Sequence, residues 1–248
     1  MQEEFINNHK ILGYYDISKE ALEEAVKLTS TKKYSLEQIV MDSDIIFITV
    51  VDGAIEKVWN QIKEFDLDGK IVCHCSGALS SEVFSNIDKC RALRYSVHPL
   101  FACSSKEDSY KDISSALFTI EGSKEKLDFM KSIIESLGNK VQVIKAKDKV
   151  KYHAAAVMAS NQMLGLIKCA CDLLKESGFD DVSALQAIKP LLFGNIHNVY
   201  RQGLKDALTG PVARGDMGTV NKHLNVIKGE TKDIYSLLTN KLIELKSN

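Results

Sequence analysis

The pattern of the chain changes near residue 147, and this change limits the fold more than any other feature. Before it, short runs rich in β-branched and aromatic residues alternate with amphipathic stretches of helical period. After it, the helical period continues but no convincing strand follows. The pattern predicts an α/β domain over residues 1–146 and an all-helical domain over residues 147–248.

The first domain is expected to hold a parallel, doubly wound sheet, because strands and helices alternate along it. The expected strands are residues 10–15, 45–51, 70–75, 92–97, 116–121 and 141–144, and the expected helices are 18–29, 54–64 and 123–137. In the second domain a long helix over residues 152–177 comes first. Asp181 or Ser183 is expected to cap the next helix, and Pro190 to kink or restart it.

Composition excludes several classes of protein. The 32 Lys and Arg balance 33 Asp and Glu, so no basic field favours nucleic acid. The longest uncharged run, residues 152–167, is shorter than a membrane span needs, and no signal peptide opens the chain. Six cysteines in so long a chain indicate reduced thiols. These features predict a soluble, cytoplasmic protein that binds neither nucleic acid nor membrane.

Polar residues follow three of the expected strands, where an open parallel sheet binds its ligands. Asp16 ends the first strand, and an acidic residue there can accept hydrogen bonds from the ribose of a dinucleotide. Val51 and Asp52 follow the second strand, and Ser76 and Gly77 follow the third. Helix capping by Asp16 and ordinary turn chemistry at the other positions remain open as alternatives.

The glycine-rich phosphate loop that accompanies such a site is missing from this sequence. None of the 14 glycines forms a G-x-G pair, so there is neither a G-x-G-x-x-G motif nor a P-loop. Asp16 lies only 16 residues from Met1, whereas the acidic residue usually follows the loop by about 20 residues. The loop and the first strand are therefore expected before Met1, with residues 2–8 as the end of a helix.

Cys73, His74 and Cys75 suggest zinc at first sight, but no second pair of cysteines with knuckle spacing exists. On a strand, Cys73 and Cys75 share one face and His74 points to the other. Buried thiols explain the pattern better, and no metal site is expected.

Histidines occur at two further places of interest. His98 precedes Pro99 at a strand end, where it is either a site residue or a structural one. On the long helix, His153 lies seven and eight residues before Ser160 and Asn161, so the three are expected on or near one face. They either face a cleft between the domains or are satisfied polar groups of the core.

The segment from Thr209 to Asp216, TGPVARGD, is expected to form a defined loop between helices. Arg214 offers a planar fork for a carboxylate or phosphate, and His223 follows in the next helix. A plain connection between helices needs neither the rigidity nor the arginine, so this segment is a candidate substrate site.

Together these segments resemble a known family. Asp16 after GYY, then CHCSGAL, HPLF, YHAAAVMASN and LTGPVARGD, look like an uncharacterised bacterial family of Rossmann-like proteins with a C-terminal helical domain of unknown function. Its members are described as short-subunit, dehydrogenase-like oxidoreductases. The sequence is more distantly similar to pyrroline-5-carboxylate reductase, deazaflavin-dependent NADP oxidoreductases and β-hydroxyacid dehydrogenases.

The resemblance implies an NAD(P)-dependent oxidoreductase that acts on a small carbonyl, imine or hydroxy compound between the two domains. A helical domain like the C-terminal domain of 6-phosphogluconate dehydrogenase would supply substrate groups and a homodimer interface. The expected cofactor residues are Asp16, Val51, Asp52, Ser76 and Gly77. The expected catalytic residues are His153, Asn161 and His98, and the expected substrate residues are Ser160, Thr209, Arg214 and His223.

Three points qualify this reading. β-Hydroxyacid dehydrogenases carry a catalytic Lys four residues before an Asn, but here Val157 stands four residues before Asn161. The charge of Asp16 would repel a 2′-phosphate, which favours NAD over NADP. The missing phosphate loop leaves an alternative: a non-catalytic, degenerate dinucleotide fold that binds a metabolite or a partner.

Overall fold

The computed structural model describes residues 5–6, 9–103, 105 and 108–247. By its contacts the chain divides into two compact units, Met1–Ser160 and Asn161–Asn248. The first unit extends beyond the expected boundary at residue 146. The physical reason is Lys149, which is buried against the strand ends and carries helix α6 with it.

The first unit contains strands and helices in alternation. Its strands are β1 (Phe5–Ile6), β2 (His9–Lys10), β3 (Gly13–Tyr14), β4 (Lys32–Lys33), β5 (Ile45–Ile48), β6 (Ile71–His74), β7 (Leu93–Leu100), β8 (Leu117–Gly122) and β9 (Lys140–Val143). Its α-helices are α1 (Lys19–Thr29), α2 (Leu36–Asp42), α3 (Asp52–Ile62), α4 (Ser109–Asp112), α5 (Leu127–Ser136) and α6 (Lys149–Ala159). Its 3₁₀ helices are η1 (Ser81–Val83), η2 (Ile87–Cys90), η3 (Ile113–Ser115) and η4 (Ala146–Asp148).

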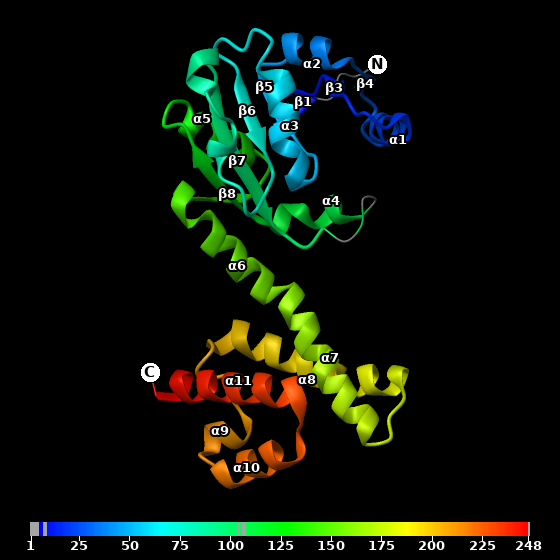
Figure 1. The fold of residues 1–248 in the computed structure, drawn as a ribbon, viewed down its shortest axis with the longest axis vertical. Helices are drawn as coiled ribbons and strands as arrows, with labels where there is room; N and C mark the ends of the chain where they lie inside the picture. The colour runs from blue at the N-terminus through cyan, green and yellow to red at the C-terminus, as the bar shows by residue number, and fades with distance from the viewer. Residues whose placement is uncertain (1–4, 7–8, 104, 106–107, 248) are drawn as a thin grey trace. The chain divides into compact units, whose positions relative to one another are not determined.

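The main sheet has five strands in the order β5-β6-β7-β8-β9 (Figure 1). Strands β5, β6 and β7 are parallel, as the alternating pattern predicts. Strand β8, however, runs antiparallel to β7, which corrects the expectation of a wholly parallel sheet. The described residues between them form only the four residues of α4 and the three of η3, too little for a crossover helix.

Two apolar clusters pack on opposite faces of this sheet. Helix α3 contributes Ile55 and Trp59 to one cluster, together with Phe84. Helix α5 contributes Met130 and Ile134 to the other cluster. The carboxyl ends of β5, β6 and β7 are thereby held at one edge of a rigid layer, where a ligand site is expected.

The amino-terminal segment differs from its expected form. Of residues 2–8, expected to end a helix, 2–4 and 7–8 lie outside the described residues, and Phe5–Ile6 forms strand β1 against β2. The single strand expected over residues 10–15 is divided between β2 and β3. Strand β3 pairs in parallel with β4 in a small sheet of its own.

Helices are the only regular elements of the second unit within its described residues, 161–247. Its helices are α7 (Asn161–Glu176), α8 (Asp181–Gln202), α9 (Gly210–Arg214), α10 (Met217–Val226) and α11 (Gly229–Ser247). The expected long helix over residues 152–177 is in fact two helices, which meet at Ser160. There the Ser160 hydroxyl donates to the carbonyl of Ala156 at 2.7 Å and competes with the helical backbone pattern.

Three expectations about the second unit need correction. The N-cap of α8 is Asp180, with Ser183 completing a capping box. Pro190 lies inside α8, which continues through it. The expected loop TGPVARG is the short helix α9, with Pro211 in its first turn and Gly215, at φ 74°, ending it.

One stretch, residues 146–176, is long and apolar enough to count as a candidate membrane span by length and composition. One such helix is weak evidence, because core helices of soluble proteins pass the same test. The break at Ser160 divides this stretch in two.

Candidate functional site

Alternation along the strands places a row of polar side chains on one face of the sheet. His74 of β6 lies opposite Ser96 of β7, which lies opposite Glu121 of β8. These three side chains are at most 3% exposed. His98 follows Ser96 by two residues and therefore faces the same way. The row leads toward the carboxyl ends of β6 and β7.

His74 shows how completely this face is hydrogen-bonded. Its Nδ1 accepts from the backbone N–H of Ser76 at 3.1 Å, and its Nε2 donates to the carbonyl of Ser80 at 3.2 Å. Burial, the main cause, lowers the pKa of His74 to about 4. His74 is therefore a neutral, structural histidine at neutral pH.

This histidine makes stability depend on pH. Its folded pKa of about 4 lies below the ordinary value of 6.5, so its contribution is complete above pH 6.5 and disappears as pH falls toward 4. We expect a loss of about 3 kcal/mol in unfolding free energy across that window. Urea unfolding at a series of pH values measures it. The His74→Gln variant, which does not titrate, should show a flatter profile; an equal slope would contradict the assignment.

The strand-to-helix turn after β6 holds Ser76 at the centre of a second network. The Ser76 hydroxyl donates to Oδ2 of Asp52 at 2.7 Å and accepts the backbone N–H groups of Ala78 and Leu79. Asp52 is the first residue of α3 and is exposed, so it ties the ends of β5 and β6 together at the surface. Sequence reasoning correctly expected both residues in the strand-end turns, and the structure joins them.

Gly77 is buried where two imidazole rings converge. A Cβ atom at Gly77 would lie 2.5 Å from Nδ1 of His153 and 2.8 Å from Nε2 of His98. The two rings are edge to face, with their centroids 6.3 Å apart. Only glycine leaves room for them both, so the three residues form one structural unit, here called the imidazole pair over Gly77.

The two imidazoles differ in their partners. Nδ1 of His98 is 2.8 Å from the hydroxyl of Tyr152, which leaves Nε2 facing Gly77. Nδ1 of His153 is buried and has no hydrogen-bond partner among the described residues. An unpaired buried polar atom costs about 1–3 kcal/mol, so a ligand that paired with it would recover that energy.

Burial, followed by the charges of Lys149 and His153, lowers the pKa of His98 to about 4. At neutral pH His98 is an uncharged hydrogen-bonding group with one ring nitrogen held by Tyr152.

Sequence reasoning missed Lys149, the most deeply buried charged residue near the pair. It is 1% exposed, and its Nζ donates to the carbonyl of Ser76 and to the hydroxyl of Ser96, both at 2.8 Å. Its signal in the sequence was spacing: Lys149, Tyr152 and His153 share one helical face at positions i, i+3 and i+4. No lysine lies four residues before Asn161, where β-hydroxyacid dehydrogenases carry theirs. Lys149, however, lies four residues before His153.

The remaining first-unit candidates lie at the surface. Asp16 follows β3, is exposed, and accepts the backbone N–H of Ser18 at 2.8 Å. Val51 is the N-cap residue of α3 and is 79% exposed. Neither position excludes the expected cofactor contacts.

The candidates of the second unit form a separate group. Thr209 precedes α9, Arg214 ends it, and both are exposed. Nδ1 of His223 on α10 is 2.7 Å from the hydroxyl of Tyr235 on α11. Asn161 is the first residue of α7 and is exposed. Ser160 ends the first unit, and substrate roles for all these residues remain predictions.

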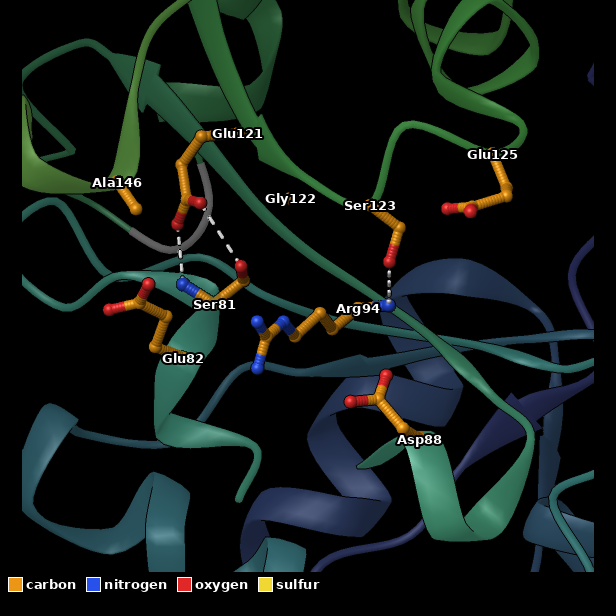
Figure 2. A pocket seen from close by; sticks show the side chains of 9 residues that line it. All are labelled: Ser81, Glu82, Asp88, Arg94, Glu121, Gly122, Ser123, Glu125 and Ala146. Atoms are coloured by element: carbon orange, nitrogen blue, oxygen red, sulfur yellow. Dashed lines mark hydrogen bonds between the residues drawn. The ribbon is translucent and has the colours of Figure 1, made fainter. Parts of the chain in front are cut away.

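A polar cavity of about 270 Å³ lies elsewhere in the first unit. Figure 2 shows Glu121 directed at Ser81, which donates both its backbone N–H and its hydroxyl to that carboxylate. Arg94, at the start of β7, also lines the cavity. Ligands of such sheets bind at the carboxyl ends of parallel strands, so the imidazole pair over Gly77 is the better candidate site.

The part of the chain that the structure describes contains no group of three or more His, Cys, Asp or Glu side chains able to hold an ion. Cys73 is completely buried, and burial raises the pKa of Cys75 to about 11, so that thiol is protonated at neutral pH.

Fold and site together define a Rossmann-like protein with a helical second domain. A Rossmann-like domain family matches residues 5–99, and a domain of unknown function (DUF2520) matches residues 116–242. The second match covers more than half of the sequence, so the chain belongs to the DUF2520 family.

Solved structures of similar fold include three informative ones. Protein TM1727 from Thermotoga maritima is 27% identical, with a TM-score of 0.79 over 98% of this chain and 94% of its own. Protein BF3122 from Bacteroides fragilis, a suggested NADP oxidoreductase, is 20% identical, with a TM-score of 0.70 over 96% and 90%. Pyrroline carboxylate reductase from Plasmodium falciparum, solved with NADP bound, is 18% identical, with a TM-score of 0.57 over 95% and 87%. A search of curated proteins found no match.

Proposed function

We propose that this protein is an NAD(P)-dependent oxidoreductase that transfers a hydride to or from a small carbonyl, imine or hydroxy compound. The observation that carries the proposal is the imidazole pair over Gly77. It places two ring nitrogens, one of them unpartnered, at the carboxyl ends of parallel strands. A substrate oxygen or nitrogen held between His98 and His153 would satisfy the unpaired Nδ1.

The residues present fit a dinucleotide at two of its parts. Val50 and Val51, which follow β5, are exposed and offer an apolar surface for a flat ring. Asp16 has an exposed carboxylate suited to ribose hydroxyls. The sequence has no G-x-G turn for the phosphates. When bound, a nicotinamide would supply or accept the hydride.

The protein's own residues would then bind and orient the substrate and move a proton. His153 would exchange that proton with the substrate heteroatom, because its Nδ1 has no competing partner. His98, kept uncharged and oriented by Tyr152, would hold the same atom by a hydrogen bond. We propose that Thr209, Arg214 and His223 orient the rest of the substrate, with Ser160 and Asn161.

Calorimetric titration of the full chain with NADH and NADPH tests the cofactor. We expect NADH to bind more tightly, because the Asp16 carboxylate repels a 2′-phosphate, and Asp16→Ala to reverse or erase that preference. Asp42→Ala, another exposed aspartate, is the control. A substrate screen that follows the absorbance of the reduced cofactor tests hydride transfer. Binding of neither dinucleotide would sink the proposal and favour the non-catalytic alternative.

We also propose a homodimer formed through the helical unit. Helix α8 exposes a series of large apolar side chains, including Leu191 at 67%, Phe193 at 64% and Tyr200 at 89%. Large exposed apolar side chains on one helix favour an interaction site. Sedimentation velocity should give twice the chain mass. Phe193→Glu should shift it toward the monomer, whereas Lys205→Glu should not; a monomeric wild-type chain would contradict the proposal.

A further inference from the structure

Lys149 is a buried charge that the proposed reaction does not use. Its ammonium group contacts the carbonyl that follows β6 and a hydroxyl of β7, and it lies 5.7 Å from the centre of the Tyr152 ring. We propose that Lys149 is a positioning residue of the candidate site, which fixes helix α6 against the ends of β6 and β7 and thereby sets the imidazole pair over Gly77. The inference rests on the proposed function in one respect: it takes the imidazole pair over Gly77 as the part of the site where the substrate reacts.

Helix α6 has two polar attachments on the face that carries His153. Lys149, in its first turn, reaches Ser76 and Ser96, and Tyr152, one turn later, reaches His98. The N-cap residue Asp148 makes no side-chain hydrogen bond to the helix. The lysine therefore anchors the start of α6 to the turn that contains Gly77.

The second step concerns charge. The Lys149 ammonium forms no ion pair within the described residues. Titratable groups surround it on every element packed against it. They are Glu121 on β8, Asp52 on α3, His74 and Cys75 at the end of β6, His98 on β7 and Tyr152 on α6 itself. Burial lowers the pKa of Lys149 to about 8, against the opposing influence of Glu121, Asp52 and Cys75. At neutral pH the group is mainly charged.

That charge acts on His98. After burial, the Lys149 ammonium is the largest cause of the lowered His98 pKa. Lys149 therefore has two separable effects on the site: its hydrogen bonds hold the rings in place, and its charge adds to burial in lowering the pKa of His98.

Three variants separate these effects in the full chain. Lys149→Met removes both, Lys149→Arg keeps the charge and donors, and Lys151→Met changes an exposed lysine of the same helix. The measurement is an NMR titration of the imidazoles without any dinucleotide, so its outcome is independent of whether the chain binds NADH. In Lys149→Met we expect the His98 midpoint to rise by about one pH unit. The Overhauser contact between the His98 and His153 rings should weaken.

Lys149→Arg should keep the midpoint low and retain the ring contact, and Lys151→Met should match the wild type. A folded Lys149→Met protein with wild-type midpoint and ring contact would overturn the proposal. If the Lys149→Met variant fails to fold, the same NMR titration of the wild-type protein tests the proposal. The His98 signals of the wild type should show a step near pH 8, at the same pH as the Cε signal of Lys149. Absence of that step would overturn the proposal as well.

Discussion

Replacing Gly77 with alanine is expected to disrupt the candidate site while the rest of the fold survives. The added methyl group would lie 2.5 Å from Nδ1 of His153 and 2.8 Å from Nε2 of His98, so at least one ring must move. Displacement of a reacting group by about 1 Å costs roughly 100-fold in rate. We expect a loss of that size in turnover of the substrate found by screening, and about 1–3 kcal/mol of lost stability from overpacking.

Gly53→Ala is the matched control. Gly53 is the second residue of α3, at the strand-to-helix connection after β5, and a Cβ there would meet nothing within 4 Å. Turnover and the thermal midpoint of this variant should stay close to the wild type. If Gly77→Ala retained full turnover, the imidazole pair over Gly77 would not be the reacting end of the site.

His153→Ala is expected to have the largest effect on catalysis. The variant removes the ring nitrogen that has no partner in the first unit, and with it the proposed proton donor. A positioned acid or base contributes about 10² to 10⁴ in rate, so turnover should fall by that factor. NADH affinity should change little, because the expected dinucleotide contacts lie at the strand ends and not on α6. Steady-state kinetics and calorimetry measure the two quantities separately.

His197→Ala provides the comparison, since His197 is an exposed histidine on α8. It should behave as wild type in both measurements. A His153→Ala variant with undiminished turnover would exclude His153 as the proton donor and leave His98 as the remaining candidate in the first unit.

Much of the architecture could be read from local patterns. The local patterns correctly predicted β5, β6 and β7 and helix α3 between β5 and β6, because period and β-branched content are properties of short segments. The sequence pattern also predicted the change from an α/β domain to a helical domain near residue 147. The antiparallel direction of β8 could not be predicted from local patterns. It depends on whether the chain between β7 and β8 forms a crossover connection.

The candidate site was predictable in part. Asp52, Ser76, Gly77, His98 and His153 were identified because each follows a strand or occupies an apolar helix. Their mutual contacts were not predictable, because they join residues up to 76 positions apart, as Gly77 and His153 do. Lys149 was overlooked because lysines at 145, 147 and 151 surround it, and only burial distinguishes one lysine from the others.

The sequence by itself determined the class of fold, the strands β5 to β9 with helices α1, α3 and α5, and the set of polar residues at the strand ends. Those follow from periodicity and residue chemistry, which act over a few positions. Only the tertiary structure decided that His98 is neutral, that Gly77 must be glycine and that Lys149 is buried. Each of these depends on which groups exclude water from which others, and that is settled when distant segments pack together.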